Sequence, residues 1–120
     1  MSIREFYEIV GGNFDEALSR LMNEQFIKKF LKKFPADDSY FSLKSAIEQD
    51  KLEDAFRAAH TLKGVAYNLE LKSLGDSASS LTEALRPGNE ERRIPEDLKQ
   101  MMKIIDTEYS KAVDAINNLD

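Results

Sequence analysis

The 120-residue sequence contains no cysteine and only one histidine. Without cysteine the chain forms no disulfide, offers no thiolate nucleophile and supplies no thiolate ligand to a metal. One histidine also falls short of the paired histidines, four residues apart, that mark helical zinc sites. We therefore expect no metal site and no cofactor bound by this chain, and the lack of disulfides is typical of a reducing compartment.

Long apolar runs are also missing. No stretch approaches the roughly 18 uncharged residues of a membrane-spanning helix, and Arg4 and Glu5 bring charge too close to the N-terminus for a signal peptide. The 17 basic and 22 acidic residues give a net charge of −5, the wrong sign for a protein that binds nucleic acid by neutralising phosphates. The sequence thus predicts a cytoplasmic protein with neither a membrane nor a nucleic acid as its partner.

Glycine and proline are scarce, with five and three residues respectively. Between them, apolar residues recur at spacings of three and four, as on one face of a helix, and no segment alternates in the manner of a strand. A chain of this length fits one domain. We expect a single all-α domain over residues 1–120, an up-down four-helix bundle with an additional short helix at its N-terminus.

The turn and cap residues set the expected helix limits. The main bundle helices are expected at 13–34, 51–69, 72–86 and 95–119, with a shorter helix at 40–49. Asn13 is expected to cap the first of these helices, and Asp50 the second. The connector that contains residues 90–93 is expected to be a solvated loop.

Two groups of large apolar residues are interpreted as core packing and not as ligand surfaces. They are the pair Met101 and Met102 and the aromatic stripe of Phe14, Phe26 and Phe30. Both groups fall at helical positions in segments that we expect to be bundle helices.

Function is expected to centre on His60. In the helix expected at 51–69, the apolar residues converge on one side and form its core face: Leu52, Ala55, Phe56, Ala59, Leu62, Ala66 and Leu69. At about 100° per residue, His60 points roughly 120° away from the centre of that face, so we expect it to reach solvent. Lys63 and Gly64 follow at three and four residues and are its neighbours on the helix surface, with Tyr67 one turn further.

Gly64 is the most informative of these neighbours. Glycine in an exposed helix costs about 1 kcal/mol relative to alanine, and at this position it buries nothing in the domain's own core. The missing side chain clears the space beside the imidazole for the surface of a partner, and Lys63 places positive charge where an anion would sit. These residues indicate a nucleophilic imidazole prepared for a phosphoryl group that another protein delivers.

The same residues carry a resemblance to a known family. The string from Ala59 to Gly64, followed by Ala66 and Asn68-Leu69, resembles the signature of histidine-containing phosphotransfer (HPt) domains, the relay modules of multistep two-component signalling. The resemblance implies a four-helix bundle with the phospho-accepting histidine at His60. It also implies that Lys63 is the basic residue near the phosphate and that Gly64 is the small residue that permits docking.

The resemblance also implies a wider contact surface and a set of partners. The residues expected to contact a partner are Arg57, Gly64, Tyr67, Asn68, Thr82 and Arg86. Thr82 or a neighbour stands where many members have a glutamine, and Glu70 stands where many have a glycine. The expected partners are receiver domains of response regulators, with a hybrid histidine kinase as a further candidate, and Mg²⁺ is expected on the receiver.

We therefore expect a monomeric phosphoryl carrier, without ATP site or independent turnover, that accepts phosphate on His60 from a receiver aspartate and passes it to another receiver. The alternative is a helical adaptor that binds a protein through an apolar patch, with His60 incidental. A hydrolase or metalloenzyme is a remote third reading, because a small bundle with one histidine shows no signature of a catalytic triad or a metal site.

Overall fold

A computed structural model describes residues 1–89 and 95–120 of the chain. The helices, in chain order, are α1 (Ile3–Ile9), α2 (Phe14–Leu21), α3 (Glu24–Lys33), the short 3₁₀ helix η1 (Phe34–Ala36), α4 (Ser39–Glu48), α5 (Leu52–Asn68), α6 (Lys72–Leu85) and α7 (Pro95–Asn117). The described ranges contain no strand, which confirms the all-α class. The connector at 90–93, expected to be a solvated loop, lies outside the described residues.

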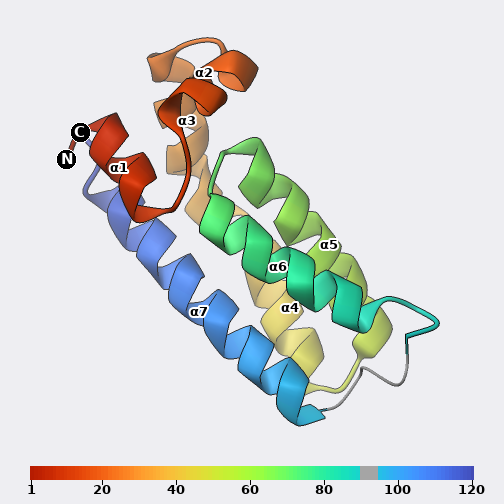
Figure 1. Cartoon of the computed structure of the whole chain (residues 1–120). Helices are drawn as coiled ribbons and strands as arrows, with labels where there is room; N and C mark the ends of the chain where they lie inside the picture. The colour runs from red at the N-terminus through yellow and green to blue at the C-terminus, as the bar shows by residue number, and fades with distance from the viewer. Residues whose placement is uncertain (90–94) are drawn as a thin grey trace.

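Helices α4 to α7 form an elongated up-down bundle (Figure 1). Helix α5 packs most extensively on α6 and on α4, and α7 closes the other side of α6. Alanine and leucine residues of α5 and α6 pack in the core, together with Ile105 and Ile116 from α7. Met102 is buried and Met101 half-buried, as expected for core packing.

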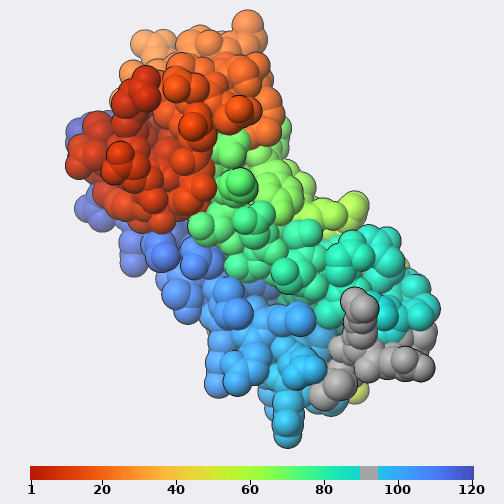
Figure 2. Space-filling view, viewed as in Figure 1, coloured from red at the N-terminus to blue at the C-terminus, as the bar shows by residue number. Residues whose placement is uncertain are grey.

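The predicted helix at 13–34 is wrong as one element, because the structure divides it into α2 and α3. Met22 separates them with φ +77°, and the Asn23 amide donates to the Leu21 carbonyl at 2.9 Å, which closes a γ-turn. The Asn23 side chain then accepts from the Phe26 amide and caps α3. The fourth bundle position is consequently taken by the shorter helix α4, while α2 and α3 lie at one end of the molecule (Figure 2).

Helices α1 to α3 are fixed to that end of the bundle by buried and paired polar groups. The Tyr7 hydroxyl donates to the Leu69 carbonyl at 3.0 Å, and burial raises the pKa of Tyr7 well above its ordinary value. Arg20 of α2 pairs with Glu70, whose side chain is only 13% exposed. The Lys32 ammonium of α3 donates to two carbonyls at the C-terminal end of α7. The α2–α3 segment is therefore held in one position relative to α5.

The turns after α4 and α5 have the same form. Asp50 and Glu70 each adopt a left-handed conformation, with φ +58° and +59°, and the amide of the next residue reaches back five residues to a helix carbonyl. Asp50 therefore ends α4 instead of capping α5, contrary to expectation, whereas Asn13 caps α2 as predicted. The left-handed φ also explains why glycine suits the position of Glu70.

Replacing Met22 by glycine is expected to stabilise the protein. A side chain at this φ strains the backbone, and glycine relieves that strain, so the free energy of unfolding should rise by about 1 kcal/mol. Urea denaturation followed by circular dichroism measures the change. Met22→Ala is the matched control, since alanine keeps the strain and should bring no such gain. A Met22→Gly variant no more stable than Met22→Ala would contradict the interpretation.

Candidate functional site

His60 lies on the exposed face of α5, as the periodicity predicts. Its core-facing neighbours Ala55, Ala59, Leu62 and Ala66 are fully buried, so the rotation of the helix is fixed and the imidazole points to solvent. Within residues 1–89 and 95–120, α5 packs most extensively on α4 and α6, which flank its core face, and His60 is exposed. The imidazole is therefore open to a group from outside the molecule.

The imidazole has an aromatic neighbour that sequence reasoning assigned to the core. The ring of Phe56 is only half-buried and lies nearly parallel to that of His60, with 6.3 Å between centroids and 19° between planes. The guanidinium of Arg86, the residue that follows α6, lies over the Phe56 ring, 5.5 Å from its centroid. The spacing of four residues between Phe56 and His60 is the signal that identifies this contact.

Arg86 also forms hydrogen bonds with a residue of α6. Its guanidinium donates to both carboxylate oxygens of Glu83, at 2.7 and 3.1 Å. This hydrogen bonding raises the pKa of Arg86, so its positive charge persists at all physiological pH values. Arg86 thus brings a fixed cation to the side of the His60 surface nearest α6.

Gly64 leaves open space on the other side of the imidazole. A Cβ atom built at Gly64 would have no neighbour within 4 Å, whereas one at Gly75 would lie 2.5 Å from the Tyr67 ring. The fold therefore requires a glycine at 75 but not at 64. Packing within the described part of the chain therefore does not explain the glycine at position 64.

Two further cations lie near His60 on α5. Lys63 is half-buried, and within the described ranges it forms no ion pair. Arg57, three residues before His60, is exposed and pairs with Asp54 at 2.5 Å. Lys63 is thus the cation with the fewest competing partners, and an anion on the imidazole would be its natural counter-ion.

Tyr67 and Thr82 occupy different places from those expected. The Tyr67 ring packs on Gly75, and its hydroxyl donates to Asp76 at 2.7 Å, while burial and this hydrogen bond raise its pKa. Tyr67 is therefore held against α6 and is not a free docking residue. Thr82 is fully buried and its hydroxyl donates to the Ala78 carbonyl at 2.7 Å, so the expectation that Thr82 contacts a partner is wrong.

Asn68 is exposed and lies at the edge of a groove between α3 and the end of α5. The groove is lined by Leu21, Phe30, Lys33, Phe34, Asp37, Val65, Asn68 and Leu69. The structure therefore brings Arg57, His60, Lys63, Gly64 and Asn68 onto one face of α5.

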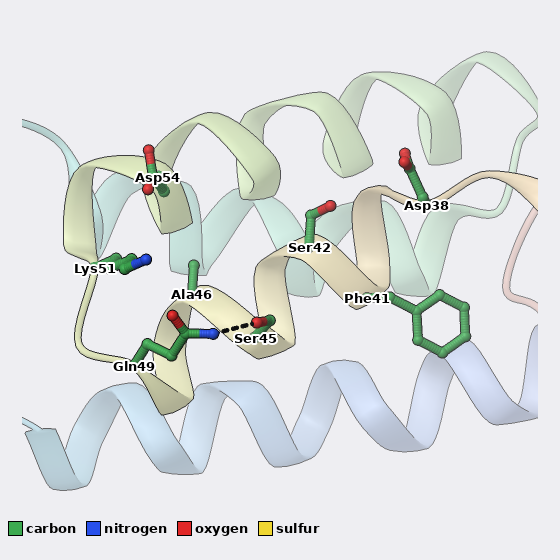
Figure 3. Close-up of a pocket in the computed structure, with 8 residues that line it drawn as sticks. All are labelled: Asp38, Phe41, Ser42, Ser45, Ala46, Gln49, Lys51 and Asp54. Atoms are coloured by element: carbon green, nitrogen blue, oxygen red, sulfur yellow. Dashed lines mark hydrogen bonds between the residues drawn. The ribbon is translucent and has the colours of Figure 1, made fainter.

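A second groove lies along the outer face of α4 and contains none of the expected site residues (Figure 3). Its lining is Asp38, Phe41, Ser42, Ser45, Ala46, Gln49, Lys51 and Asp54, in which Gln49 donates to the Ser45 hydroxyl at 2.8 Å. The Phe41 ring packs edge-on against Tyr109 of α7. The groove has no histidine and offers no general base paired with a nucleophile.

Two further features of the described residues bear on function. These residues include no group of three or more histidine and carboxylate side chains placed to hold a metal ion. None of their helices is long and apolar enough to cross a membrane.

Comparison with known proteins identifies the family. No curated protein and no solved structure matches the chain. The family described as "Hpt domain" matches residues 35–117, which comprise α4 to α7 and include His60, Lys63 and Gly64. Hpt domains are phosphotransfer carriers of two-component systems and not enzymes in the usual sense. Because the match covers more than half of the sequence, this chain belongs to the Hpt domain family.

Proposed function

We propose that this chain carries phosphoryl groups between receiver domains of a two-component phosphorelay, with His60 as the residue that holds the phosphate. The observation that carries the proposal is the exposed imidazole beside an unfilled position at Gly64. A nucleophile that receives its phosphate from another protein must be reachable by a second surface, and this pair provides both the reacting atom and the clearance.

The reaction is a phosphoryl exchange between a carboxylate and an imidazole. An unprotonated nitrogen of His60 attacks phosphorus of the receiver's aspartyl phosphate, an N–P bond forms, and the P–O bond to the aspartate breaks with release of its carboxylate. The proton on the other ring nitrogen remains or passes to solvent. In the second transfer the aspartate of another receiver attacks the same phosphorus and restores the imidazole, so no net turnover occurs on this chain.

Charge neutralisation is shared between the two proteins. Phosphoryl transfer depends mainly on in-line positioning and on stabilisation of charge on the equatorial oxygens. Lys63 supplies one cation from α5, Phe56 restricts the imidazole on the side away from Gly64, and Arg86 lies over the Phe56 ring. The Mg²⁺ that completes the charge balance is expected to be bound by the receiver. We expect the carrier to act as a monomer in the cytoplasm.

Replacing His60 by glutamine tests the nucleophile. After incubation with a receiver that carries ³²P on its aspartate, the wild-type chain should acquire label that survives alkali and is lost in acid, as expected for an N–P bond. His60→Gln should acquire none while keeping its helical circular dichroism, because the residue is exposed. Label retained in the variant would remove His60 from the mechanism and favour the adaptor function.

Replacing Gly64 tests the clearance. Gly64→Gln should slow transfer from a receiver at least tenfold by obstructing docking, and Gly64→Ala should be affected less. Both variants should be about 1 kcal/mol more stable in urea, because the fold leaves this position empty. Gly75→Ala is the matched control and should be destabilised by its clash with Tyr67. Transfer by Gly64→Gln at the wild-type rate would refute the steric argument.

Lys63→Ala should reduce the transfer rate about tenfold, well short of the complete loss in His60→Gln, because it deletes charge and leaves the nucleophile in place. Lys63→Arg should recover most of the rate. Stopped-flow or quenched-flow transfer assays give these rates. Equal losses in the alanine and arginine variants would indicate that Lys63 acts through packing and not through its charge.

A further inference from the structure

Helix α3 and the turn before it expose three large apolar side chains, and two of them, Phe26 and Phe30, were wrongly expected to be core. Met22 is 80% exposed, and Phe26 and Phe30 are each 42% exposed, with 6.5 Å between the two ring centroids. We call these three residues the α3 strip. They lie outside residues 35–117, so the family match does not account for them. Adjacent exposed apolar residues of this size mark interaction sites more often than scattered ones do.

The α3 strip continues into the surface of α5. Phe30 lines the groove described above, whose opposite wall is formed by Val65 and Asn68 of α5. Val65 directly follows Gly64, and Asn68 lies one helical turn after it on the exposed face. One surface therefore runs from His60 past Gly64 into the groove and out along the α3 strip.

The distances place the groove within the reach of a partner bound over His60. Asn68 is eight residues after His60, which corresponds to about 12 Å along α5. A standard interface covers about 800 Å² on each partner, which corresponds to a radius of about 16 Å. A receiver centred on the imidazole therefore covers the near wall of the groove as well.

The groove has a cationic rim, and the helices on its α3 side are tied to the bundle. Arg20, Tyr7 and Lys32 attach the α1–α3 segment to the bundle, so little conformational entropy is lost when a partner binds. Lys33 lines the groove, and Lys29 lies one turn before it on α3; neither forms an ion pair among the residues that the structure describes.

The acidic residue in the lining, Asp37, is already engaged, because its carboxylate accepts from both the amide and the hydroxyl of Ser39. That carboxylate keeps its negative charge, but the ammonium groups of Lys29 and Lys33 together outweigh it, so this edge of the groove carries a net positive charge. Its apolar walls and cationic rim are complementary to an apolar side chain with a carboxylate beside it.

We propose that the groove and the α3 strip are the second part of the docking surface for the receiver that exchanges phosphate with His60. That receiver inserts an apolar side chain between Phe30 and Val65 and places a carboxylate against Lys29 or Lys33. The proposal rests on the proposed function. It assigns partner selection to the N-terminal helices and phosphate exchange to α5.

The test separates docking from chemistry by using two phosphate donors. Phosphoramidate transfers its phosphoryl group to an imidazole nitrogen with loss of ammonia and needs no protein interface, whereas a receiver must dock. In Phe26→Ser/Phe30→Ser, labelling of His60 by phosphoramidate should match wild type. The receiver concentration for half-maximal transfer should rise at least tenfold, as for loss of an interface hot spot.

Two more variants guard against misfolding and non-specific effects. Met22→Gly removes the most exposed side chain of the strip and is expected to be more stable than wild type, so weaker receiver transfer in this variant cannot be attributed to unfolding. Ile104→Ser is the matched apolar control. Ile104 lies on α7, outside the proposed docking surface, and its side chain is 55% exposed, so this variant should behave as wild type.

The outcomes distinguish the two proposals. The docking proposal is overturned if the receiver concentration for half-maximal transfer is unchanged in both Phe26→Ser/Phe30→Ser and Met22→Gly. The carrier function stays intact in that case, provided that transfer still requires His60. A loss of self-association in sedimentation without a change in receiver transfer assigns the strip to a second copy of the chain and also overturns the docking proposal. Failure of wild-type His60 to take phosphate from receivers, with phosphoramidate labelling intact, overturns the carrier function itself.

Discussion

Burial of one apolar face fixes the rotation of α5 about its axis, and the site depends on that rotation. Ala55, Ala59, Leu62 and Ala66 are fully buried against α4 and α6. Turning the helix by one residue, about 100°, would expose this set and bury His60. Burial of these side chains therefore sets the orientation of α5. The exposure of His60 thus depends on residues that do not contact the partner.

Helical periodicity was sufficient for the fold class and for most of the helices, because an apolar stripe that matches the helix period has few alternative structures. It failed at 13–34. The stripe continues through Met22, and neither Met22 nor Asn23 excludes a helix by its residue type. The only local signal of the break is that Asn23 is a good N-cap. Asp50 shows the converse error, since a residue suited to capping the next helix instead ends the previous one.

Much of the site was predictable for the same reason, since His60, Lys63 and Gly64 share one helix and their relation follows from its pitch. Contacts between helices were not. Phe56 was assigned to the core, yet its ring lies beside the imidazole with Arg86 over it. Thr82 was assigned to the surface and is buried. These positions depend on how α6 packs against α5, and the spacing of residues along the sequence does not predict that packing.

The fit of the Tyr67 ring onto Gly75 determines how far α6 can slide along α5. A Cβ atom at position 75 would lie 2.5 Å from the Tyr67 ring, so close packing at this glycine favours one axial register of the two helices, which the hydrogen bond from the Tyr67 hydroxyl to Asp76 maintains. That register sets which residue of α6 lies level with Phe56. Gly75, which does not contact the imidazole, thus helps to align Arg86 with the ring of Phe56 on α5.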